Sequence, residues 1–243
     1  MTIIILGNIM KLDKATVLIT GANRGIGLAF AKAALARGAS KVYAGARDPL
    51  SVTLPGVTPL RLDVNSPADI AAAVEVAGDV SVVINNAGIA QFGGLLAADA
   101  EASLRQQLET NVFGVLRVSR AFAPVLAANG GGALLNVASV ASWISGPALA
   151  GYAVSKSATW SLSNGLRNEL RGQKTQVLTL HMAFVDTDMT QGIASPKSTP
   201  EEIVARAFDA LEAGADEVLA DEMTQQVQLG LSMRPGVYLQ ARG

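Results

Sequence analysis

Three residues of the chain have the types and spacing of an acid–base centre that works without histidine. Tyr152 and Lys156 lie four residues apart at the start of a predicted helix, so they share one helix face. An ammonium beside a phenol and the positive end of a helix both favour the phenolate, which suits a general acid near neutral pH. A Tyr-x-x-x-Lys spacing also occurs by chance on helix surfaces. Ser139, just after the predicted strand 133–138, favours the chemical interpretation because it is expected to face the same crevice.

A glycine-rich loop indicates where a dinucleotide would bind. The first predicted strand ends at Thr20 and runs into Gly21-Ala22-Asn23-Arg24-Gly25-Ile26-Gly27, after which a helix is expected. Glycines in a strand-to-helix turn let backbone N–H groups approach a phosphate at the helix N-terminus. The spacing is G-x-x-x-G-x-G rather than the more familiar G-x-G-x-x-G. An ordinary turn uses the same residue types, but the place between the first strand and the first helix favours dinucleotide binding.

A second loop, Asn85-Asn86-Ala87-Gly88, follows the predicted buried strand 80–84. Ligands in open parallel sheets lie at the carboxyl ends of the strands. The asparagines could brace the central strands, and Gly88 could let a ribose approach. An ordinary turn is the alternative interpretation, because Asn and Gly favour turns.

Composition argues against several other kinds of site. The 243 residues include no cysteine and one histidine, His181. Disulfides, thiolate chemistry and a multi-histidine metal centre are therefore excluded, a Ser-His-Asp hydrolase is disfavoured, and we expect no metal site. A formal net charge of −1 disfavours nucleic-acid binding. The apolar run 2–6 is far shorter than the ~20 residues of a membrane-spanning helix, so we expect no membrane contact and a cytoplasmic protein.

Short apolar runs alternate with longer amphipathic ones along the chain. Strands are predicted at 15–20, 41–46, 58–62, 80–84, 133–138, 175–180 and 217–220, and helices at 25–37, 67–77, 100–128, 150–171, 200–213 and 222–232. Near-continuous β-branched and leucine runs are typical of parallel strands covered on both faces. The alternation predicts an α/β, doubly wound Rossmann-type fold with a seven-stranded, mostly parallel sheet and helices on both faces. We expect one domain over residues 11–243, preceded by an N-terminal extension, residues 1–10.

Taken together, the motifs make the chain resemble the short-chain dehydrogenase/reductase family, in its compact single-domain branch. The resemblance covers roughly residues 14–231. It rests on Thr20 and the three loop glycines, Asp63-Val64, Asn85-Asn86-Ala87-Gly88, Asn111, Ser139, and Tyr152 with Lys156, in order and at family-like separations. As a set these motifs are far more specific than any one of them. The resemblance implies an oxidoreductase that uses a nicotinamide cofactor.

The resemblance also implies a role for each catalytic residue. Tyr152 would exchange the proton with the substrate oxygen, and Ser139 would hydrogen-bond that same oxygen. Lys156 would bind the nicotinamide ribose and lower the pKa of Tyr152. Asn111 would hold a water that connects Lys156 to solvent as a proton relay. The nicotinamide would carry the hydride, while the protein supplies orientation and a tuned acid.

A cofactor site is implied in the same way. The loop glycines would hold the diphosphate, and Asp63 and Val64 would contact the adenine. Asn85, Ala87 and Gly88 would lie at the adjoining ribose. The full set implied to bind the cofactor is Gly21, Asn23, Arg24, Gly25, Ile26, Gly27, Arg47, Asp63, Val64, Asn85, Ala87, Gly88, Tyr152, Lys156, Val185 and Thr187, with Thr187 at the nicotinamide amide.

One segment departs from the family's pattern. After the strand 175–180, family members typically show Pro-Gly, a few residues and then Thr, whereas this chain has His181-Met182-Ala183-Phe184-Val185-Asp186-Thr187. Met182 and Ala183 replace the Pro-Gly. A positive φ at Ala183 would strain the backbone, and its methyl group would crowd the nicotinamide ring. We interpret His181 as a strand-end residue rather than a catalyst.

Two arginines favour NADP(H) over NAD(H). NAD-type sites place an acidic residue about 20 positions after the glycines, where it binds the ribose 2′-hydroxyl. Here Arg47 follows the strand 41–46 and Arg24 lies in the glycine loop, and two guanidinium groups suit a 2′-phosphate. Alternatively, both arginines are solvated surface residues. Asp48 keeps NAD(H) open, since a register shift of about one residue would put an acid at the ribose.

The pocket implied by the resemblance is apolar. It includes Phe92, Trp143, Ile144, Leu149, Phe184, Met189 and Ile193, which could equally be core or interface residues. An apolar pocket suits a hydrophobic ketone, aldehyde or alcohol, so we expect a carbonyl reductase or alcohol dehydrogenase. The alternative is a catalytically silent NADP(H)-binding regulator on the same fold, which Met182-Ala183 favours. Apolar helix faces around 104–126 and 153–170 predict a homotetramer, with a dimer second.

Overall fold

Seven parallel strands carry the site in the computed structural model, which describes residues 10–240. They are β1 (Thr16–Thr20), β2 (Lys41–Ala46), β3 (Thr58–Arg61), β4 (Val82–Asn85), β5 (Gly132–Val137), β6 (Thr175–His181) and β7 (Glu217–Leu219). Their order across the sheet is β3-β2-β1-β4-β5-β6-β7, and every pairing is parallel. The predicted doubly wound fold is confirmed, and each strand lies within about two residues of its predicted bounds.

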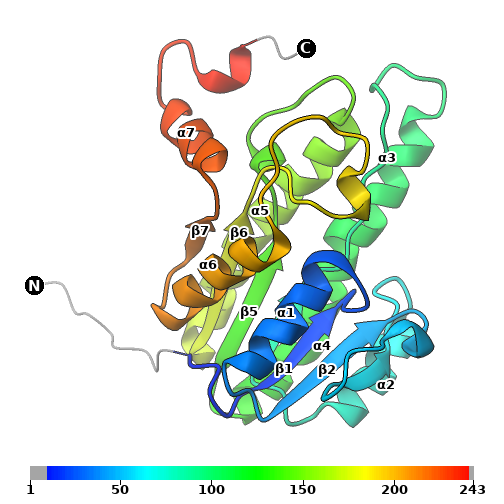
Figure 1. Cartoon of the computed structure of the whole chain (residues 1–243), viewed down its shortest axis with the longest axis vertical. Helices are drawn as coiled ribbons and strands as arrows, with labels where there is room; N and C mark the ends of the chain where they lie inside the picture. Colours follow the sequence, from blue (N-terminus) through cyan, green and yellow to red (C-terminus); the bar gives the residue numbers. More distant parts are fainter. Residues whose placement is uncertain (1–9, 241–243) are drawn as a thin grey trace, which may run out of the picture.

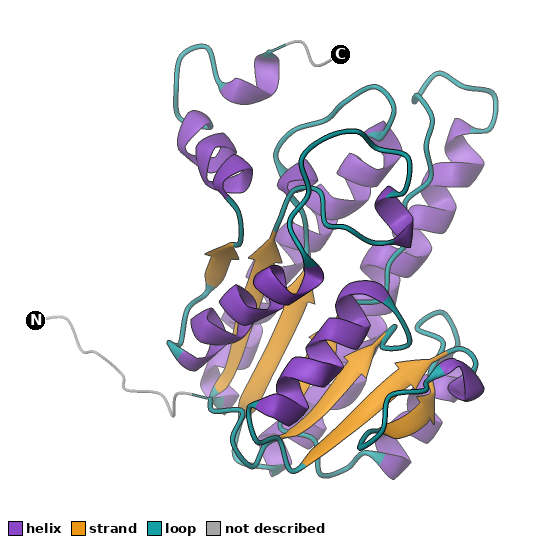
Figure 2. Ribbon diagram, in the orientation of Figure 1, coloured by secondary structure: helices purple, strands orange, loops and turns teal. Residues whose placement is uncertain are grey.

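Helices cover both faces of the sheet, as Figures 1 and 2 show. The helices are α1 (Gly25–Ala36), α2 (Pro67–Val76), α3 (Ala100–Leu108), α4 (Val115–Ala128), α5 (Ala150–Leu170), α6 (Pro200–Glu212) and α7 (Glu222–Gly230). Alternate strand residues point to opposite faces. In β1, Val17 and Ile19 join the core under α1 and α6, whereas Leu18 joins the core under α2, α4 and α5. Both faces are therefore apolar, which explains the near-continuous apolar strands of the sequence.

Two helices begin where the sequence predicts a capping hydroxyl before a proline. The Ser66 hydroxyl accepts a hydrogen bond from the Asp69 N–H at 3.1 Å at the start of α2. At the start of α6, the Thr199 hydroxyl accepts from the Glu202 N–H at 3.2 Å, and the Glu202 carboxylate accepts from the Thr199 N–H at 3.0 Å. These bonds satisfy backbone N–H groups that the first helical turn leaves without partners.

The single helix predicted over 100–128 is interrupted. A π-helical turn, Glu109–Gly114, separates α3 from α4. By length and composition the run Ala100–Ala128 could cross a membrane, since an 18-residue window within it has a mean hydropathy of 1.2. Val118, Phe122 and Leu126 of this run are fully buried in the core under α2, α4 and α5, as in the core helix of a globular fold. Its buried stripe therefore accounts for much of its apolar composition.

The described chain begins against the core and ends beyond the carboxyl edge of the sheet. Of the expected N-terminal extension, residues 1–9 lie outside the described residues, and Met10 packs against the core under α1 and α6. At the other end, α7 extends beyond the carboxyl ends of the strands, as α3 does on the opposite side of the molecule (Figure 1). The carboxyl edge of the sheet is thus flanked by helices, and this edge holds the site.

Candidate active site

All four residues predicted to be catalytic lie at the carboxyl edge of the sheet. Ser139 follows β5, Asn111 lies in the π-helical turn, and Tyr152 and Lys156 occupy the first turns of α5. The Lys156 ammonium donates to the carbonyl of Val137, the last residue of β5, at 2.7 Å, and its Nζ lies 5.6 Å from the centre of the Tyr152 ring. The structure therefore brings the phenol, the ammonium and the serine hydroxyl together.

Burial controls the two ionisable groups of this centre. It raises the pKa of Tyr152 to about 12, and a hydrogen bond with the Ser139 hydroxyl opposes this shift. It lowers the pKa of Lys156 to about 8. Both directions follow from the penalty that burial places on a charged form. The expected lowering of the Tyr152 pKa by Lys156 is not found in this geometry, where Ser139 is the group that favours the phenolate.

The Asn111 side chain acts as a brace. Its Nδ2 donates to the Ile89 carbonyl at 2.8 Å and to the Ser155 hydroxyl at 2.9 Å, and its Oδ1 accepts from the Ile89 N–H at 2.8 Å. Its backbone carbonyl accepts from the Thr159 hydroxyl at 2.9 Å. Both amide hydrogens are therefore used to join the loop after β4 to α5. The expected water could be held only through acceptor lone pairs that remain free.

The glycine loop has the geometry that a phosphate cradle requires. Gly21 and Gly25 have φ of +67° and +54°, in the left-handed region that favours glycine. A Cβ at Gly27 would lie 2.0 Å from the carbonyl oxygen of Gly21, so no other residue fits there. The start of α1 can therefore come close to an anionic group, which is what a diphosphate needs.

Two residues that the sequence analysis did not assign to the site hold this loop in place. The Thr20 hydroxyl accepts from the N–H groups of Asn86 at 3.0 Å and Ala87 at 2.9 Å. The Asn86 side chain donates to the carbonyls of Thr20 at 2.9 Å and Gly21 at 3.1 Å. The signal was present in the sequence, because Thr20 ends β1 and Asn86 directly follows β4, and these two strands are neighbours in the sheet.

Of the two roles expected for Asn85, the structure shows the brace between central strands rather than the ribose contact that the resemblance implies. The Asn85 side chain is buried and donates to the Asn136 Oδ1 at 2.8 Å and the Ser119 hydroxyl at 3.0 Å. It therefore braces β4 against β5 and α4, and it offers no side-chain contact to a ribose. Gly88 lies at the catalytic centre instead: a Cβ there would be 3.8 Å from the Lys156 Nζ.

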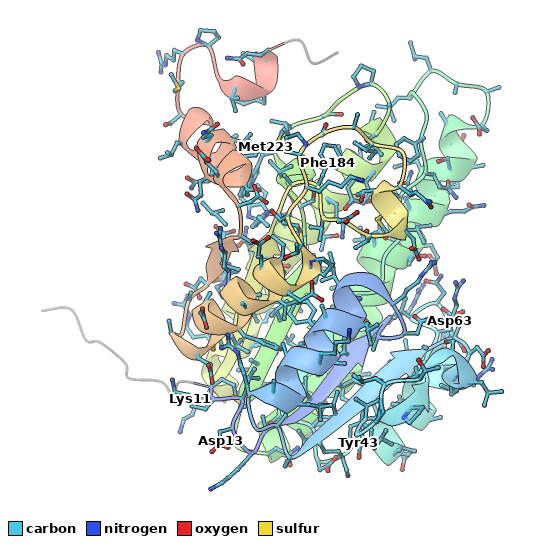
Figure 3. The ribbon with its side chains drawn as sticks, in the orientation of Figure 1. Lys11, Asp13, Tyr43, Asp63, Phe184 and Met223 are labelled. Atoms are coloured by element: carbon cyan, nitrogen blue, oxygen red, sulfur yellow. The ribbon has the colours of Figure 1, made fainter. Side chains whose placement is uncertain are left out.

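The remaining residues of the predicted cofactor set follow the carboxyl ends of several strands. Asn23, Arg24 and Ile26 follow β1, Arg47 follows β2, Asp63 and Val64 follow β3, Ala87 follows β4, and Val185 and Thr187 follow β6. Asp63 and Phe184 lie on opposite sides of β1 in the strand order, and Figure 3 shows them well apart along this edge. The set is therefore spread along the carboxyl edge of the sheet, as an extended dinucleotide would require.

Two exposed arginines follow β1 and β2, at the place where the resemblance implies the adenosine. The Arg24 guanidinium lies 3.2 Å from the Asp188 carboxylate, and both side chains are about 70% exposed. Arg47 is exposed and has no carboxylate within ion-pair distance in residues 10–240. Asp48 accepts a hydrogen bond from the Leu50 N–H at 3.0 Å, so it caps its own turn. Asp63 likewise accepts from the Asn65 N–H at 2.9 Å, and Val64 is buried.

The segment in place of Pro-Gly is free of backbone strain. Among the non-glycine residues of the described part, only Lys14 and Lys174 have positive φ, so Ala183 does not. The Ala183 N–H donates to the Asp221 carboxylate at 2.6 Å. Downstream, a Cβ at Gly25 would lie 3.4 Å from the Thr187 methyl group, which places Thr187 beside the glycine loop. A polar hollow of about 340 Å³ adjoins Thr187 and is lined in part by Asp186 and Lys197.

The residues expected at the substrate pocket fall into two groups. Phe92 and Met189 are exposed at the carboxyl edge, whereas Ile144 is buried and packs with Val140 and Val227 of α7. Trp143 stacks on His181, with ring centroids 4.2 Å apart. Within residues 10–240, no cluster of three or more His, Asp or Glu residues could hold a metal ion.

Comparisons with known proteins agree with this geometry. The family model for short chain dehydrogenases matches residues 15–198. Galactitol 2-dehydrogenase (L-tagatose-forming) of Cereibacter sphaeroides is 34% identical over 193 residues, which cover 75% of this chain and 76% of the relative. The 1-deoxy-11-beta-hydroxypentalenate dehydrogenase of Streptomyces avermitilis is 31% identical over 84% of this chain and 81% of the relative.

A solved structure is similar over nearly the whole chain. It is a short chain dehydrogenase from Burkholderia cenocepacia in complex with NADP, with 35% identity and a TM-score of 0.89. The match covers 93% of this chain and 96% of that one. With its seven-stranded parallel sheet and glycine loop, the chain belongs to the short-chain dehydrogenase/reductase family and is an oxidoreductase of that type.

Proposed function

We propose that the protein transfers a hydride between NADP(H) and a carbonyl compound or secondary alcohol, as a carbonyl reductase or alcohol dehydrogenase. The observation that carries this proposal is the convergence of Ser139, Tyr152 and Lys156 beside the glycine loop. The catalytic set proposed is Asn111, Ser139, Tyr152 and Lys156. A cofactor-binding protein without turnover would need the loop but not the acid.

Each residue of the set has a proposed role. A bound nicotinamide supplies the hydride chemistry. The Tyr152 phenol gives its proton to the substrate oxygen, and the Ser139 hydroxyl donates a hydrogen bond to that oxygen. Lys156, whose pKa burial lowers to about 8, can lose and regain a proton near neutral pH, so it can return a proton to the phenolate that Tyr152 leaves behind. Asn111 keeps the loop after β4 against α5 through its bonds to Ile89 and Ser155.

NADP(H) is the proposed cofactor, with NAD(H) as the alternative. The glycine loop fits a dinucleotide because position 27, which lies against the Gly21 carbonyl, accommodates only glycine. This close packing lets the start of α1 approach the diphosphate. Arg24 and Arg47 are the proposed partners of the 2′-phosphate, and Asp48 is engaged in its own turn. The NADP in the similar Burkholderia cenocepacia structure supports this choice. The ratio of kcat/KM for NADPH to that for NADH tests it directly.

The proposed substrate is a hydrophobic ketone or aldehyde. Phe92 and Met189 expose apolar surface at the carboxyl edge, and Phe184 and Met223 of α7 lie at the same end of the molecule (Figure 3). NADPH oxidation with acetophenone, cyclohexanone, decanal and ethyl acetoacetate tests the proposal, and turnover of at least one is expected. Because one relative is named for galactitol, oxidation of that polyol is the contrasting assay. Turnover of galactitol alone would overturn the hydrophobic assignment.

Met182-Ala183 was the sequence feature that favoured a silent regulator. Ala183 does not adopt a positive φ, so the strain on which that alternative depended is not found. We therefore keep turnover as the proposal. The absence of NADPH oxidation with every carbonyl compound, together with tight NADPH binding, would restore the regulator.

We also propose a cytoplasmic homotetramer, with a dimer second, in which residues 11–243 act as one dinucleotide-binding and catalytic domain. Phe113, in the π-helical turn, and Val154, on α5, are 47% and 40% exposed, and such apolar exposure is typical of interfaces. No nucleic-acid or membrane partner is proposed. Light scattering at micromolar concentration is expected to give a tetramer, and a monomer alone would contradict the proposal.

A further inference from the structure

The one histidine of the chain lies under the turn that carries Ser139. His181 is fully buried, and its ring stacks on Trp143 with an angle of 19° between the planes. Its Nδ1 is 3.1 Å from the carbonyl oxygen of Ser139, and its Nε2 is 3.6 Å from the Glu217 carboxylate. The reaction proposed above uses neither ring nitrogen, so the position of this side chain requires an explanation.

The sheet register brings these groups together. β5 and β6 are paired, with Val137 opposite Leu180, so His181, one residue further along β6, lies close to Ser139, two residues beyond Val137. On the other side of β6, Thr179 is opposite Glu217, and Thr179 and His181 share one face because strand side chains alternate. Trp160 of α5 completes the cluster by donating its indole N–H to Glu217 at 2.7 Å.

Chemistry decides which ring nitrogen of His181 carries the proton. A carbonyl oxygen only accepts hydrogen bonds, so Nδ1 must be the donor to Ser139. The Glu217 carboxylate, which accepts from the Trp160 indole N–H at 2.7 Å, lies 3.6 Å from Nε2, beyond hydrogen-bond distance. The Nδ1 bond to the Ser139 carbonyl and the stacking on Trp143 therefore give the imidazole one defined orientation.

The bond from His181 bears on the catalytic hydroxyl. The Ser139 carbonyl also accepts from the Ser142 N–H at 3.0 Å, which closes the turn after β5. The Ser142 hydroxyl donates to the Lys156 carbonyl at 3.1 Å, so this turn is joined to the helix that carries Tyr152. We propose that His181 is a positioning residue for Ser139, which it holds through the backbone carbonyl so that the hydroxyl faces the substrate oxygen.

His181 touches neither the reacting atoms nor the glycine loop, and the inference rests on the proposed function through the role of Ser139. It predicts that His181 acts on catalysis only through Ser139. Loss of the imidazole should therefore lower kcat and leave cofactor affinity unchanged. A residue needed only for stability would behave differently, because its loss would not be coupled to Ser139.

The first test needs no substrate. Because the chain has one histidine, ¹⁵N-histidine labelling gives one Nδ1 and one Nε2 signal in the NMR spectrum of the whole protein. The inference predicts a protonated Nδ1 at every pH at which the protein is folded. A neutral ring that carries its proton on Nε2 alone would overturn it. This result stands even if no carbonyl compound is turned over, which would count against the proposed function instead.

The second test is a double-mutant cycle, assayed with NADPH and the fastest of the four carbonyl compounds. His181→Leu should lower kcat by about 10-fold or more, since a small displacement of a positioned group has effects of that size. His181→Asn, whose Nδ2 can replace the Nδ1 donor, should recover kcat to within about 3-fold of the unmutated protein. In a Ser139→Ala background, His181→Leu should lower kcat less than about 2-fold. An equal loss in both backgrounds would overturn the inference.

Two further variants serve as a packing control and as a substitute for His181→Leu. Leu180→Val removes buried volume from the neighbouring residue on the opposite face of β6, and its kcat should stay within about 2-fold of normal. If His181→Leu does not fold, Glu217→Ala removes the carboxylate that lies 3.6 Å from Nε2 and should lower kcat about 2- to 5-fold, but not in the Ser139→Ala background. NADPH affinity should remain unchanged in every variant, and any other pattern would contradict the inference.

Discussion

Replacing Arg47 by alanine should lower kcat/KM for NADPH about 10- to 100-fold and leave kcat/KM for NADH nearly unchanged. Arg47 lies directly after β2, at the carboxyl edge of the sheet where we propose that the adenosine binds. Its guanidinium is exposed and has no carboxylate within ion-pair distance in the described part of the chain. It can therefore bind a 2′-phosphate without first breaking another ion pair.

The magnitude follows from that contact. A hydrogen bond to a charged group is worth about 1.5–3 kcal/mol, and each ~1.4 kcal/mol corresponds to a factor of ten. Arg24 differs, because it must first leave Asp188, 3.2 Å away. An exposed ion pair of this kind is worth about 0.2–1 kcal/mol. Asp188→Asn should therefore free Arg24 and raise kcat/KM for NADPH about 1.4- to 5-fold.

Initial rates with NADPH and with NADH, measured for the unmutated protein and for each variant, give the kcat/KM values to compare. Arg47→Asp should go further than Arg47→Ala, because a carboxylate repels the phosphate and offers the ribose hydroxyl an acceptor. Added salt should weaken NADPH more than NADH, since both arginines are exposed. Equal losses for both cofactors in Arg47→Ala would refute the reasoning. A preference of the unmutated protein for NADH would also refute it and would return Asp48 to consideration.

Two further predictions concern stability. Thr20→Val leaves the N–H groups of Asn86 and Ala87 without their shared acceptor, so the free energy of unfolding in urea should fall by about 2 kcal/mol. Thr16→Val, in the same strand, is the control. Equal losses in the two variants would contradict the account. Burial lowers the pKa of Lys156 to about 8, so above that pH the unfolded chain holds more protons than the folded one. Between pH 8 and 10 the unfolding free energy of the unmutated protein should therefore rise relative to that of Lys156→Met. A difference between the two proteins that does not change with pH would refute this prediction.

The strands and most helices were predictable because their signals are local. Apolar runs such as that of β1 and capping pairs such as Ser66-Pro67 are properties of neighbouring residues. The π-helical turn in the predicted helix 100–128 is not local. Asn111 within it is held by the backbone of Ile89, 22 residues away, and by the Ser155 hydroxyl, 44 residues away. Periodicity in the sequence carries no record of such contacts.

The candidate site also has features that local sequence signals predict and features that depend on contacts between distant residues. Residue types and spacing predicted that Ser139, Tyr152 and Lys156 converge, because strand ends and helix starts meet at one edge of the sheet. The direction of a side chain is decided by packing, so Asn85 was expected at the ribose and instead braces β4 against β5. His181 was interpreted as a strand-end residue, which is correct, but its contact with the Ser139 carbonyl depends on the register of β5 and β6.

The central claim is that Tyr152 is the proton donor of a working reductase. The most direct measurement is the turnover of Tyr152→Phe with NADPH and the fastest carbonyl compound, beside NADPH affinity measured by titration calorimetry. Phenylalanine keeps the ring and removes only the hydroxyl, so the account predicts that kcat falls at least ~10²-fold while NADPH binds as before. A variant that turns over at a near-normal rate would contradict the account, because the proton would then come from another group.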